Sequence, residues 1–351
     1  MAIVLTQALV DLAHTKFGTK WAEDWQQSKA LLTQFTTPID GAQGKYMRFP
    51  RIGGTEVQEY TDNEQSISFS KLKHGNYGFK PRKFFNAIPL NTDDTEEAFD
   101  LDFTLGTIRN AQQKAAERFM DEVTLGVVRD QDTGLYRVKT DSDSGNGGGI
   151  LGYSYSGENG EDKHALDLTY ESFAKGEGNL VAIDYATTGT GVSSMLAGTL
   201  IDRMKYIVRR LAENEAFNSV DPSEIVLAIS PAIAQVLGSL EMSINRDYAI
   251  GDLGDIGRPV YNRAIGATIV QTNMLPTMNT EDKNGTPVNG ARMCCAWLKS
   301  QVGFGRWAGT EFRIKDVNDK VAVDYYLRVK GKAGCGRRRD DAVFVLPVLE
   351  S

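Results

Sequence analysis

The sequence KYMRFPRIGGTEVQEYTDNEQSISFSKLKHGNYGFKPRKFFNAIP, residues 45–89, predicts one long β-hairpin. Apolar and polar residues alternate strictly from Ser66 to Ser70, which is typical of a strand with one drier face. Gly75, Gly78 and Pro81 are positions where we expect the return strand to bend. A two-stranded ribbon has no core of its own and is only marginally stable in water. We therefore expect a second copy of the chain to cover it.

The charges of this stretch and of the residues after it are strongly segregated. A basic segment without any acid holds Lys71, Lys73, Lys80, Arg82 and Lys83. An acidic segment follows, with Asp93, Asp94, Glu96, Glu97, Asp100 and Asp102. Exposed ion pairs contribute only ~0.2–1 kcal/mol each, so they set the register of docking more than its strength. We expect the two segments to meet between neighbouring copies, with apolar rows and strand edges supplying the strength.

A long helix is predicted directly after the hairpin, from Thr95 to Arg129. Asp94 and Glu97 have the spacing of a capping box at its start. Apolar residues then recur at steps of three and four: Leu101, Leu105, Ile108, Ala111, Ala115, Phe119 and Val123. A helix of ~30 residues spans ~45 Å, well beyond the ~11–12 residues of an average helix. The pattern indicates a strut.

The segments on either side of the hairpin and helix are less regular. Residues 1–36 predict one or two short helices with widely spaced apolar residues, which suits an arm laid across a partner. Packing on the chain's own domain is the alternative. Residues 130–165 are rich in turn formers, and 141–149 reads DSDSGNGGG. We expect a surface loop or a small β insertion there, most flexible at the glycine run.

The second half of the chain mixes strands and helices. A short helix at 170–176, a strand at 180–185 and a strong helix at 194–218 come first. Val226–Ile229 reads as a buried strand, Ser230-Pro231 opens a helix, and 266–270 is a further strand. Four C-terminal strands are predicted at 296–302, 312–315, 320–330 and 342–348. Strands and helices around a sheet indicate the α+β class.

Composition narrows the class of protein. A length of 351 residues favours roughly two domains, and 41% hydrophobic with 24% charged residues is ordinary for a globular chain. The net charge of -7 argues against a protein that grips nucleic acid by neutralising phosphates. We find no signal-peptide pattern and no membrane-length apolar run, and expect a cytosolic protein without membrane contact. The cysteines Cys294, Cys295 and Cys335 are predicted to be reduced and buried.

No motif carries a recognisable chemistry. The glycine turn at 189–194 lacks the third glycine of a dinucleotide fingerprint, and 251–258 lacks the Gly-Lys-Ser/Thr of a phosphate loop. The acidic loop at 141–152 ends on glycine where calcium needs a bidentate glutamate. His14, His74 and His164 are not at metal-ligand spacing. We expect no catalytic residue, cofactor or metal, and interpret Arg337–Asp341 as a solvated turn or an inter-subunit salt network.

The order of these elements resembles the major capsid proteins of tailed phages, which have the Hong Kong phage capsid fold. Two local patterns carry the resemblance most closely: Val226–Pro231, where a strand leads into a helix, and Gly266–Pro276, where a strand ends in an Asn-x-Leu-Pro turn. The resemblance implies an N-terminal arm (1–44), an extended β-hairpin loop (45–90), a peripheral domain (91–180, with spine helix 95–129 and flexible insertion 135–165), an axial domain (181–310), and C-terminal strands returning to the peripheral domain (311–351).

The resemblance also implies a function. Copies would form pentamers and hexamers of an icosahedral shell in the virion, enclosing double-stranded DNA without sequence-specific contact. A portal protein and a decoration protein are further partners in such particles, which assemble in the bacterial cytoplasm. Because only some 40 residues precede the hairpin, we expect a separate scaffolding protein. We do not expect covalent crosslinks.

Two other functions stay open from the sequence. An encapsulin-like nanocompartment has the same fold but holds protein cargo, so the contents of the particle distinguish it from a phage shell. A nucleotide-dependent oxidoreductase built on the strand, turn and helix at 181–210 would bind nicotinamide or flavin as a discrete oligomer, and a binding titration tests this.

Overall fold

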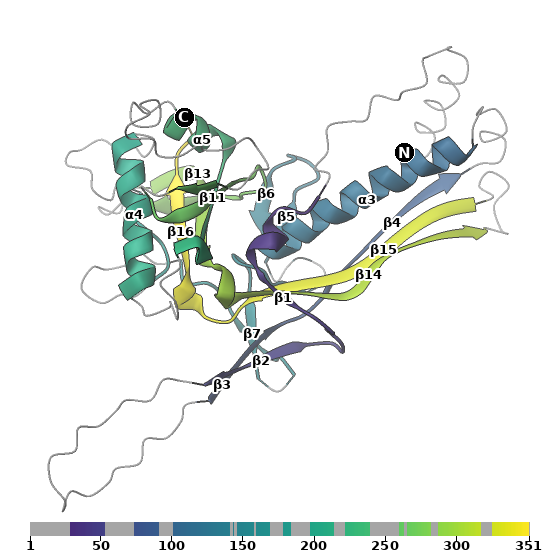
Figure 1. The fold of residues 1–351 in the computed structure, drawn as a ribbon, viewed down its shortest axis with the longest axis horizontal. Helices are drawn as coiled ribbons and strands as arrows, with labels where there is room; N and C mark the ends of the chain where they lie inside the picture. Colours follow the sequence, from purple (N-terminus) through teal and green to yellow (C-terminus); the bar gives the residue numbers. More distant parts are fainter. Residues whose placement is uncertain are drawn as a thin grey trace, which may run out of the picture.

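The computed structural model describes residues 29–52, 74–90, 101–140, 143, 146–157, 159–168, 178–183, 197–213, 222–238, 260–262, 265–281, 287–316 and 325–350. These residues form a long sheet backed by one helix and a six-stranded mixed sheet with further helices, so the α+β class is confirmed. Figure 1 shows the long sheet and its helix extending away from the body that contains the mixed sheet.

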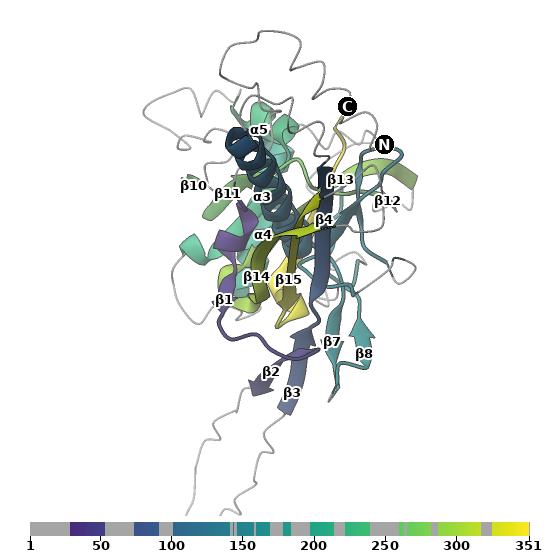
Figure 2. The same cartoon turned by 90° about the vertical axis from the view of Figure 1, so that its right-hand side faces the viewer.

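The long sheet is antiparallel except at its short edge strand. Its order is β1 (Thr37–Ile39), β14 (Val302–Asp316), β15 (Tyr325–Arg337) and β4 (Arg82–Leu90). Helix α3 (Leu101–Leu125) lies along one face of this sheet, as both views show (Figures 1 and 2). The ring of Phe84 in β4 packs against that of Phe119 in α3, with ring centroids 4.9 Å apart.

Helix α3 ends four residues earlier than the sequence predicts, and its predicted first residues, 95–100, lie outside the described part of the chain. Gly126 stops it with φ +80°, a conformation that favours glycine as the residue closing a helix. A Cβ on Gly126 would lie 2.2 Å from the carbonyl oxygen of Gly148. Residues Val127–Arg129 are instead strand β5, paired with β6 (Tyr136–Val138).

The buried stripe of α3 differs from the predicted one at Ala111 and Ala115, whereas Phe119 and Val123 pack inward as predicted. Ala111 and Ala115 are exposed, whereas Ala116 and Met120 are buried. The reason is Gln112, whose amide donates to the backbone oxygen of Leu327 at 2.9 Å and thereby turns a polar residue toward the sheet. A hydrogen bond to strand β15 fixes which side of the helix faces inward.

The mixed sheet forms the larger core. Its strands run in the order β10 (Val260–Asn262), β11 (Ala267–Gln271), β9 (Ile225–Ile229), β13 (Pro287–Leu298) and β12 (Thr277–Glu281), and β16 (Val343–Val348) also pairs with β13. Every residue of β9, β11 and β16 is buried. The predicted strand at Val226–Ile229 and the strand at 266–270 are confirmed, and they pair in parallel.

Helices α4 (Ala197–Glu213) and α5 (Pro231–Gly238) belong to this body, and α4 lies beside β16 (Figure 1). The predicted helix start at Ser230-Pro231 is confirmed. Ser230 Oγ accepts the N–H of Ile233 at 3.3 Å, so it caps the helix that Pro231 begins. Short 3-10 turns lie at Leu32–Phe35, Pro222–Glu224, Lys299–Gln301 and Asp340–Ala342.

The C-terminal strands divide between the two sheets. Strand β14 enters the long sheet already at Val302, and β15 stays there. Strand β16 returns to β13 in the mixed sheet, so the expectation that all of residues 311–351 return to the peripheral domain is wrong for the last strand. A strand as apolar as β16 needs cover on both faces, which the mixed sheet and its helices provide.

The predicted insertion at 135–165 is partly β, but its glycine run is not a surface loop. Strands β7 (Ser154–Ser156) and β8 (Asp162–His164) extend a small sheet with the hairpin. Gly147–Leu151 are buried. Gly149 N–H donates to the oxygen of Cys335 at 2.8 Å, and Ile150 N–H to that of Thr124 at 2.8 Å. The glycines let this turn press against the end of α3.

The described part of the N-terminal arm packs on the chain's own body. Leu31 and Leu32 each donate their backbone N–H to the carboxylate of Asp121 at 2.9 Å. Trp297, fully buried, donates its indole N–H to the oxygen of Phe35 at 2.8 Å. For residues 29–44 the alternative of self-packing is therefore correct, while residues 1–28 lie outside the described residues.

The cysteines are free and buried, as predicted, and burial raises the pKa of Cys294 to about 12. In the part of the chain that the structure describes, no helix is both long and apolar enough to cross a bilayer. The same residues contain no group of three or more side chains able to hold a metal ion.

The Asp121 contact predicts how firmly the arm is held. We expect Asp121→Ala to lower the free energy of unfolding by about 1.5–3 kcal/mol, because two backbone N–H groups lose a charged acceptor. Asp202→Ala, at an exposed position of α4, is the matched control and should stay within about 0.5 kcal/mol of wild type. Urea denaturation measures both, and equal midpoints for the two variants would contradict the assignment.

Candidate inter-subunit surface

The base of the predicted hairpin is present. Strands β2 (Met47–Ile52) and β3 (His74–Phe79) pair antiparallel, with Met47 opposite Phe79 and Ile52 opposite His74. The remainder of the hairpin, residues 53–73, lies outside the described residues. We call the β2–β3 pair the hairpin root.

The return strand leaves the ribbon earlier than predicted. After Lys80 and Pro81 the chain becomes β4, which pairs with β15 from Arg82 onward. The prediction of one ribbon up to Pro89 is therefore wrong for its last eight residues. Proline cannot donate a ladder hydrogen bond, so Pro81 separates the two pairings.

The hairpin root packs on four glycines of the long sheet. Gly303 pairs with Gly336, and Gly305 with Gly334, in the register of β14 and β15. We call these four residues the glycine platform. A Cβ on Gly336 would lie 2.7 Å from Phe79 Cβ, and one on Gly303 would lie 2.8 Å from Phe49 Cζ. The two rings can rest on these strands only because the strands carry no side chains there.

The aromatic rings on the platform also contact one another. The Phe79 ring lies 5.4 Å from that of Phe49 and 5.4 Å, edge-on, from that of Trp307. Arg338 covers Phe49, with its guanidinium carbon 4.7 Å from the ring centroid. Phe79 is fully buried as a result. The hairpin root is thus anchored to the body by an aromatic cluster.

Farther along the long sheet, the face opposite α3 is basic. Alternate residues of a strand share a face. Helix α3 covers the face that carries Phe84, Val329 and Phe312, since Arg109 of the helix stacks on the ring of Phe312. The opposite side carries the acid Glu311, the exposed residues Phe85 and Ala87, and five cations whose side chains the structure describes. These cations, named here the basic face, are Lys83, Arg313, Arg328, Lys330 and Lys332.

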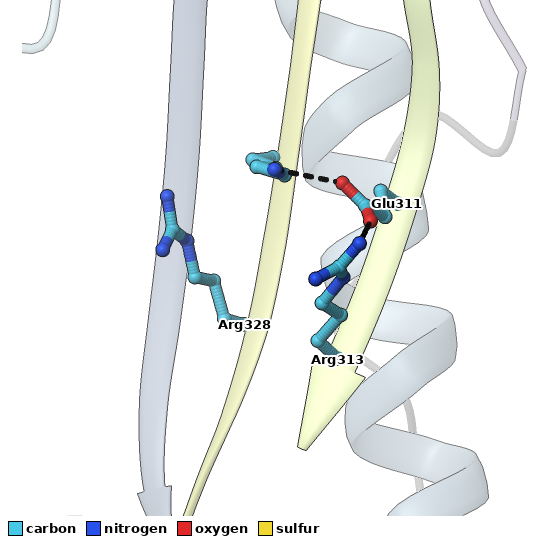
Figure 3. Close-up of a pocket in the computed structure, with 4 residues that line it drawn as sticks. Glu311, Arg313 and Arg328 are labelled. Atoms are coloured by element: carbon cyan, nitrogen blue, oxygen red, sulfur yellow. Dashed lines mark ion pairs between the residues drawn. The ribbon is translucent and has the colours of Figure 1, made fainter. Parts of the chain in front are cut away.

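Glu311 neutralises only part of the basic face. It pairs with Lys330 at 2.8 Å and with Arg313, and the bond from Lys330 is the main cause that lowers the pKa of Glu311. Figure 3 shows these two ion pairs converging on Glu311 in a shallow pocket of about 60 Å³, while Arg328 has no ion pair with the residues drawn. The surface keeps an excess of positive charge.

Two cross-strand pairs on this face join like charges. Arg313 lies opposite Arg328, and Lys83 lies opposite Lys332. Like charges directly opposite each other destabilise a sheet. Phe85, opposite Lys330, is 75% exposed, which is unusual for a large apolar side chain on a sheet. A partner surface with acidic and apolar side chains would reduce the repulsion between the like charges and would bury Phe85.

The inter-subunit candidates from the sequence are placed as follows. Lys83 is exposed and belongs to the basic face. Lys80 is half-buried, with its ammonium 4.8 Å above the Tyr155 ring. Lys71, Lys73, Asp93, Asp94, Glu96, Glu97 and Asp100 lie outside the described residues, as does the side chain of Asp102.

Arg82 is buried within the subunit. It is only 7% exposed and donates from Nη1 to the oxygen of Val127 at 3.0 Å and of Glu122 at 3.3 Å. Its guanidinium therefore holds the end of α3 and the start of β5 within one subunit. Sequence reasoning also missed Arg328, Lys330 and Lys332, although a cation at every second residue of one strand was the available signal.

Arg82 and Lys83 should respond very differently to charge reversal. We expect Arg82→Glu to lower the free energy of unfolding by about 3–5 kcal/mol, because it places a carboxylate against two carbonyl oxygens in a buried site. Lys83→Glu should change it by less than about 0.5 kcal/mol. Chemical denaturation distinguishes the two, and an Arg82→Glu variant as stable as wild type would refute the intramolecular role.

The glycine platform makes a separate prediction. Gly336→Ala should displace Phe79 and lower the free energy of unfolding by about 1–3 kcal/mol, the usual cost of overpacking, with a change in the near-ultraviolet circular dichroism of the aromatic cluster. Gly106→Ala, at an exposed site of α3 with open space around it, should instead stabilise the chain by up to ~1 kcal/mol. A Gly336→Ala variant with an unchanged aromatic spectrum would count against the platform.

No protein-family model and no curated protein sequence matches the chain. Solved structures do match it almost from end to end. A chain from the capsid of Ralstonia phage GP4 aligns with TM-score 0.59 at 12% identity, covering 96% of this chain and 95% of that one. The capsid of cyanophage P-SCSP1u gives TM-score 0.56 at 16% identity, with 97% and 94% covered.

The capsid of Myoviridae phage XM1 matches equally completely, with TM-score 0.57 at 13% identity and with 97% of this chain and 98% of that one covered. At such identities the likeness is one of fold. This chain has the fold of bacteriophage capsid subunits.

Proposed function

We propose that this chain is the major capsid protein of a tailed phage, and that its copies assemble into a closed icosahedral shell. The observation that carries the proposal is the end-to-end likeness to phage capsid chains, which covers at least 94% of both partners in the three structures compared. Likeness over nearly the whole chain to capsid subunits supports a structural, non-enzymatic role.

The charges of the chain suit repeated contact between copies. The chain has a net charge of -7 yet presents a basic face. Two acidic stretches of a neighbouring copy are suited to that face: the acidic segment at Asp93–Asp102, and the hairpin residues 53–70, which contain four acids and no base. A surface that binds a different surface of the next copy produces rings or open fibres, and closed symmetry avoids the fibre.

The finer features of the particle follow from this proposal. Copies form pentamers and hexamers around their axial domains, and the hairpin of one copy lies over the next. Lys71, Lys73, Lys80 and Lys83 remain contact candidates on the basic side, with Asp93, Asp94, Glu96 and Glu97 on the acidic side. The shell encloses double-stranded DNA without reading its sequence, and a scaffolding protein, a portal and a decoration protein complete it in the bacterial cytoplasm.

Assembly of charge-reversed variants tests the proposal. We expect the purified chain, alone or with its scaffolding protein, to give hollow closed particles in negative-stain microscopy. Lys83→Glu with Lys332→Glu should abolish them while leaving the circular dichroism spectrum unchanged, because both residues are exposed. Lys205→Glu with Lys299→Glu changes the charge equally at exposed positions elsewhere and should still assemble.

The outcomes separate two parts of the proposal. If the wild-type chain gives no closed particle under either condition, the shell function is contradicted. If the Lys83 and Lys332 variant assembles normally, only the electrostatic contact fails. Particles purified from the native source should contain double-stranded DNA, whereas a co-purifying enzyme in place of DNA would favour the nanocompartment.

A further inference from the structure

A cavity of about 500 Å³ opens where β4 begins, between helix α3 and the β5–β6 hairpin. Its volume lies within the range of ~300–1,000 Å³ typical of small-ligand sites. Three cations, Arg82, Lys83 and Lys139, line it together with one acid, Asp143, and the apolar residues Phe119 and Val128. The cavity is distinct from the shallow pocket around Glu311.

The cations of this cavity are fixed by the surrounding structure. Arg82 and Lys139 are 7% and 5% exposed. Arg82 lies against Phe119, with its guanidinium carbon 5.0 Å from the ring centroid. Lys139 donates from Nζ to the oxygen of Asn146 at 2.8 Å. Lys83 is exposed and stands at the rim. Two buried cations and one rim cation therefore face the same space.

These cations disfavour one another. Burial, and next the charge of Arg82, lower the pKa of Lys139 to about 8. Burial is also the main cause that lowers the pKa of Arg82. Both shifts have the sign that burial of a cation produces, and Asp143 opposes both. A bound anion would reverse both.

The nearby carboxylates are already engaged. Asp143 accepts a hydrogen bond from Nη1 of Arg137 at 2.7 Å and another from the backbone N–H of Thr140. Arg137 is not one of the three cations that line the cavity. The bond from Arg137 is the largest cause that holds the pKa of Asp143 below its usual range. Glu122 lies 3.8 Å from Arg118. Three cations and one carboxylate that is already paired with Arg137 line the cavity, so its described lining is positive on balance.

Arg82 has donors left for a ligand. Both of its hydrogen bonds to described residues leave from Nη1, so in the described part of the chain Nε and Nη2 have no acceptor. A guanidinium edge presents two parallel N–H groups that match the two oxygens of a carboxylate or phosphate. An ammonium group nearby adds a further donor to the same anion.

We propose that this cavity is an oxyanion-binding site, which takes a carboxylate or a phosphate group between Arg82, Lys139 and Lys83. The oxyanion has two sources: an acidic side chain of a neighbouring copy, or a free phosphate ion. The site concerns a single subunit and does not depend on the proposed shell function.

The test uses the unassembled chain and inorganic sulfate, which keeps its two charges over a wide pH range. Sulfate should raise the thermal unfolding midpoint above that in chloride of equal ionic strength. The rise should grow with the logarithm of the sulfate concentration and reach roughly 5 °C when sulfate is in hundredfold excess over its Kd. Lys139→Gln and Lys83→Gln should each lose most of this difference. Lys205→Gln removes the same charge from exposed α4 and should keep it.

Lys83→Gln keeps the test decisive if Lys139→Gln fails to fold, because Lys83 is exposed and its replacement should not disturb folding. A sulfate effect that is equal in all four proteins overturns the proposal. Since the measurement needs no particle, its failure is distinguishable from a failure of assembly.

Assembled particles then identify the source of the oxyanion. If a neighbouring carboxylate fills the cavity, the sulfate effect disappears in particles and returns when they are dissociated. If the source is a free ion, the effect persists in particles. Each result supports an oxyanion site and assigns its occupant.

Discussion

The structure depends on the absence of side chains at four positions of the long sheet. Phe79 and Phe49 lie directly on the backbone of β14 and β15, at distances that a Cβ on Gly303, Gly334 or Gly336 would not permit. Because the end of β3 is fixed there, the chain must turn at Lys80-Pro81 and continue as β4 beside β15. The same glycines thus determine where the hairpin begins and which strand closes the long sheet.

This arrangement divides one face of the long sheet into two parts with different roles. Near the body, the hairpin root covers the glycine platform with aromatic rings. Farther out, the same face carries Lys330 and Lys332 of β15 and Lys83 of β4, and no described element of the subunit covers it. Helix α3 shields the opposite face. The uncovered half combines positive charge with the exposed ring of Phe85. The charges would therefore set the position in which a partner docks, and the apolar contact would supply most of the binding free energy.

The sequence predicted the elements whose signals are local. Strand β9 is a short apolar run, and Ser230 with Pro231 supplies the cap and first turn of α5, so neighbouring residues suffice to define both. The orientation of α3 was not predictable, because Gln112 faces inward to satisfy a carbonyl 215 residues away. Arg82 was misinterpreted for the same reason: its neighbours are basic and accessible, whereas its hydrogen-bond acceptors come from the end of α3 and from β5. The platform did leave a signal, in Gly303-Phe-Gly305 and Gly334-Cys-Gly336.

The two sheets are joined in a way that limits their relative motion. The chain passes from mixed to long sheet through Lys299–Gln301 and returns through residues 338–342. At the return crossing, Arg337 is fully buried and donates to Asp340 at 2.8 Å and to the oxygen of Ile150 at 2.8 Å. Removing a buried cation from such partners is costly, so the crossing, the glycine turn and the end of α3 move as one unit. In a shell whose subunits occupy unlike positions, we therefore expect the angle between the two sheets to stay the same from subunit to subunit.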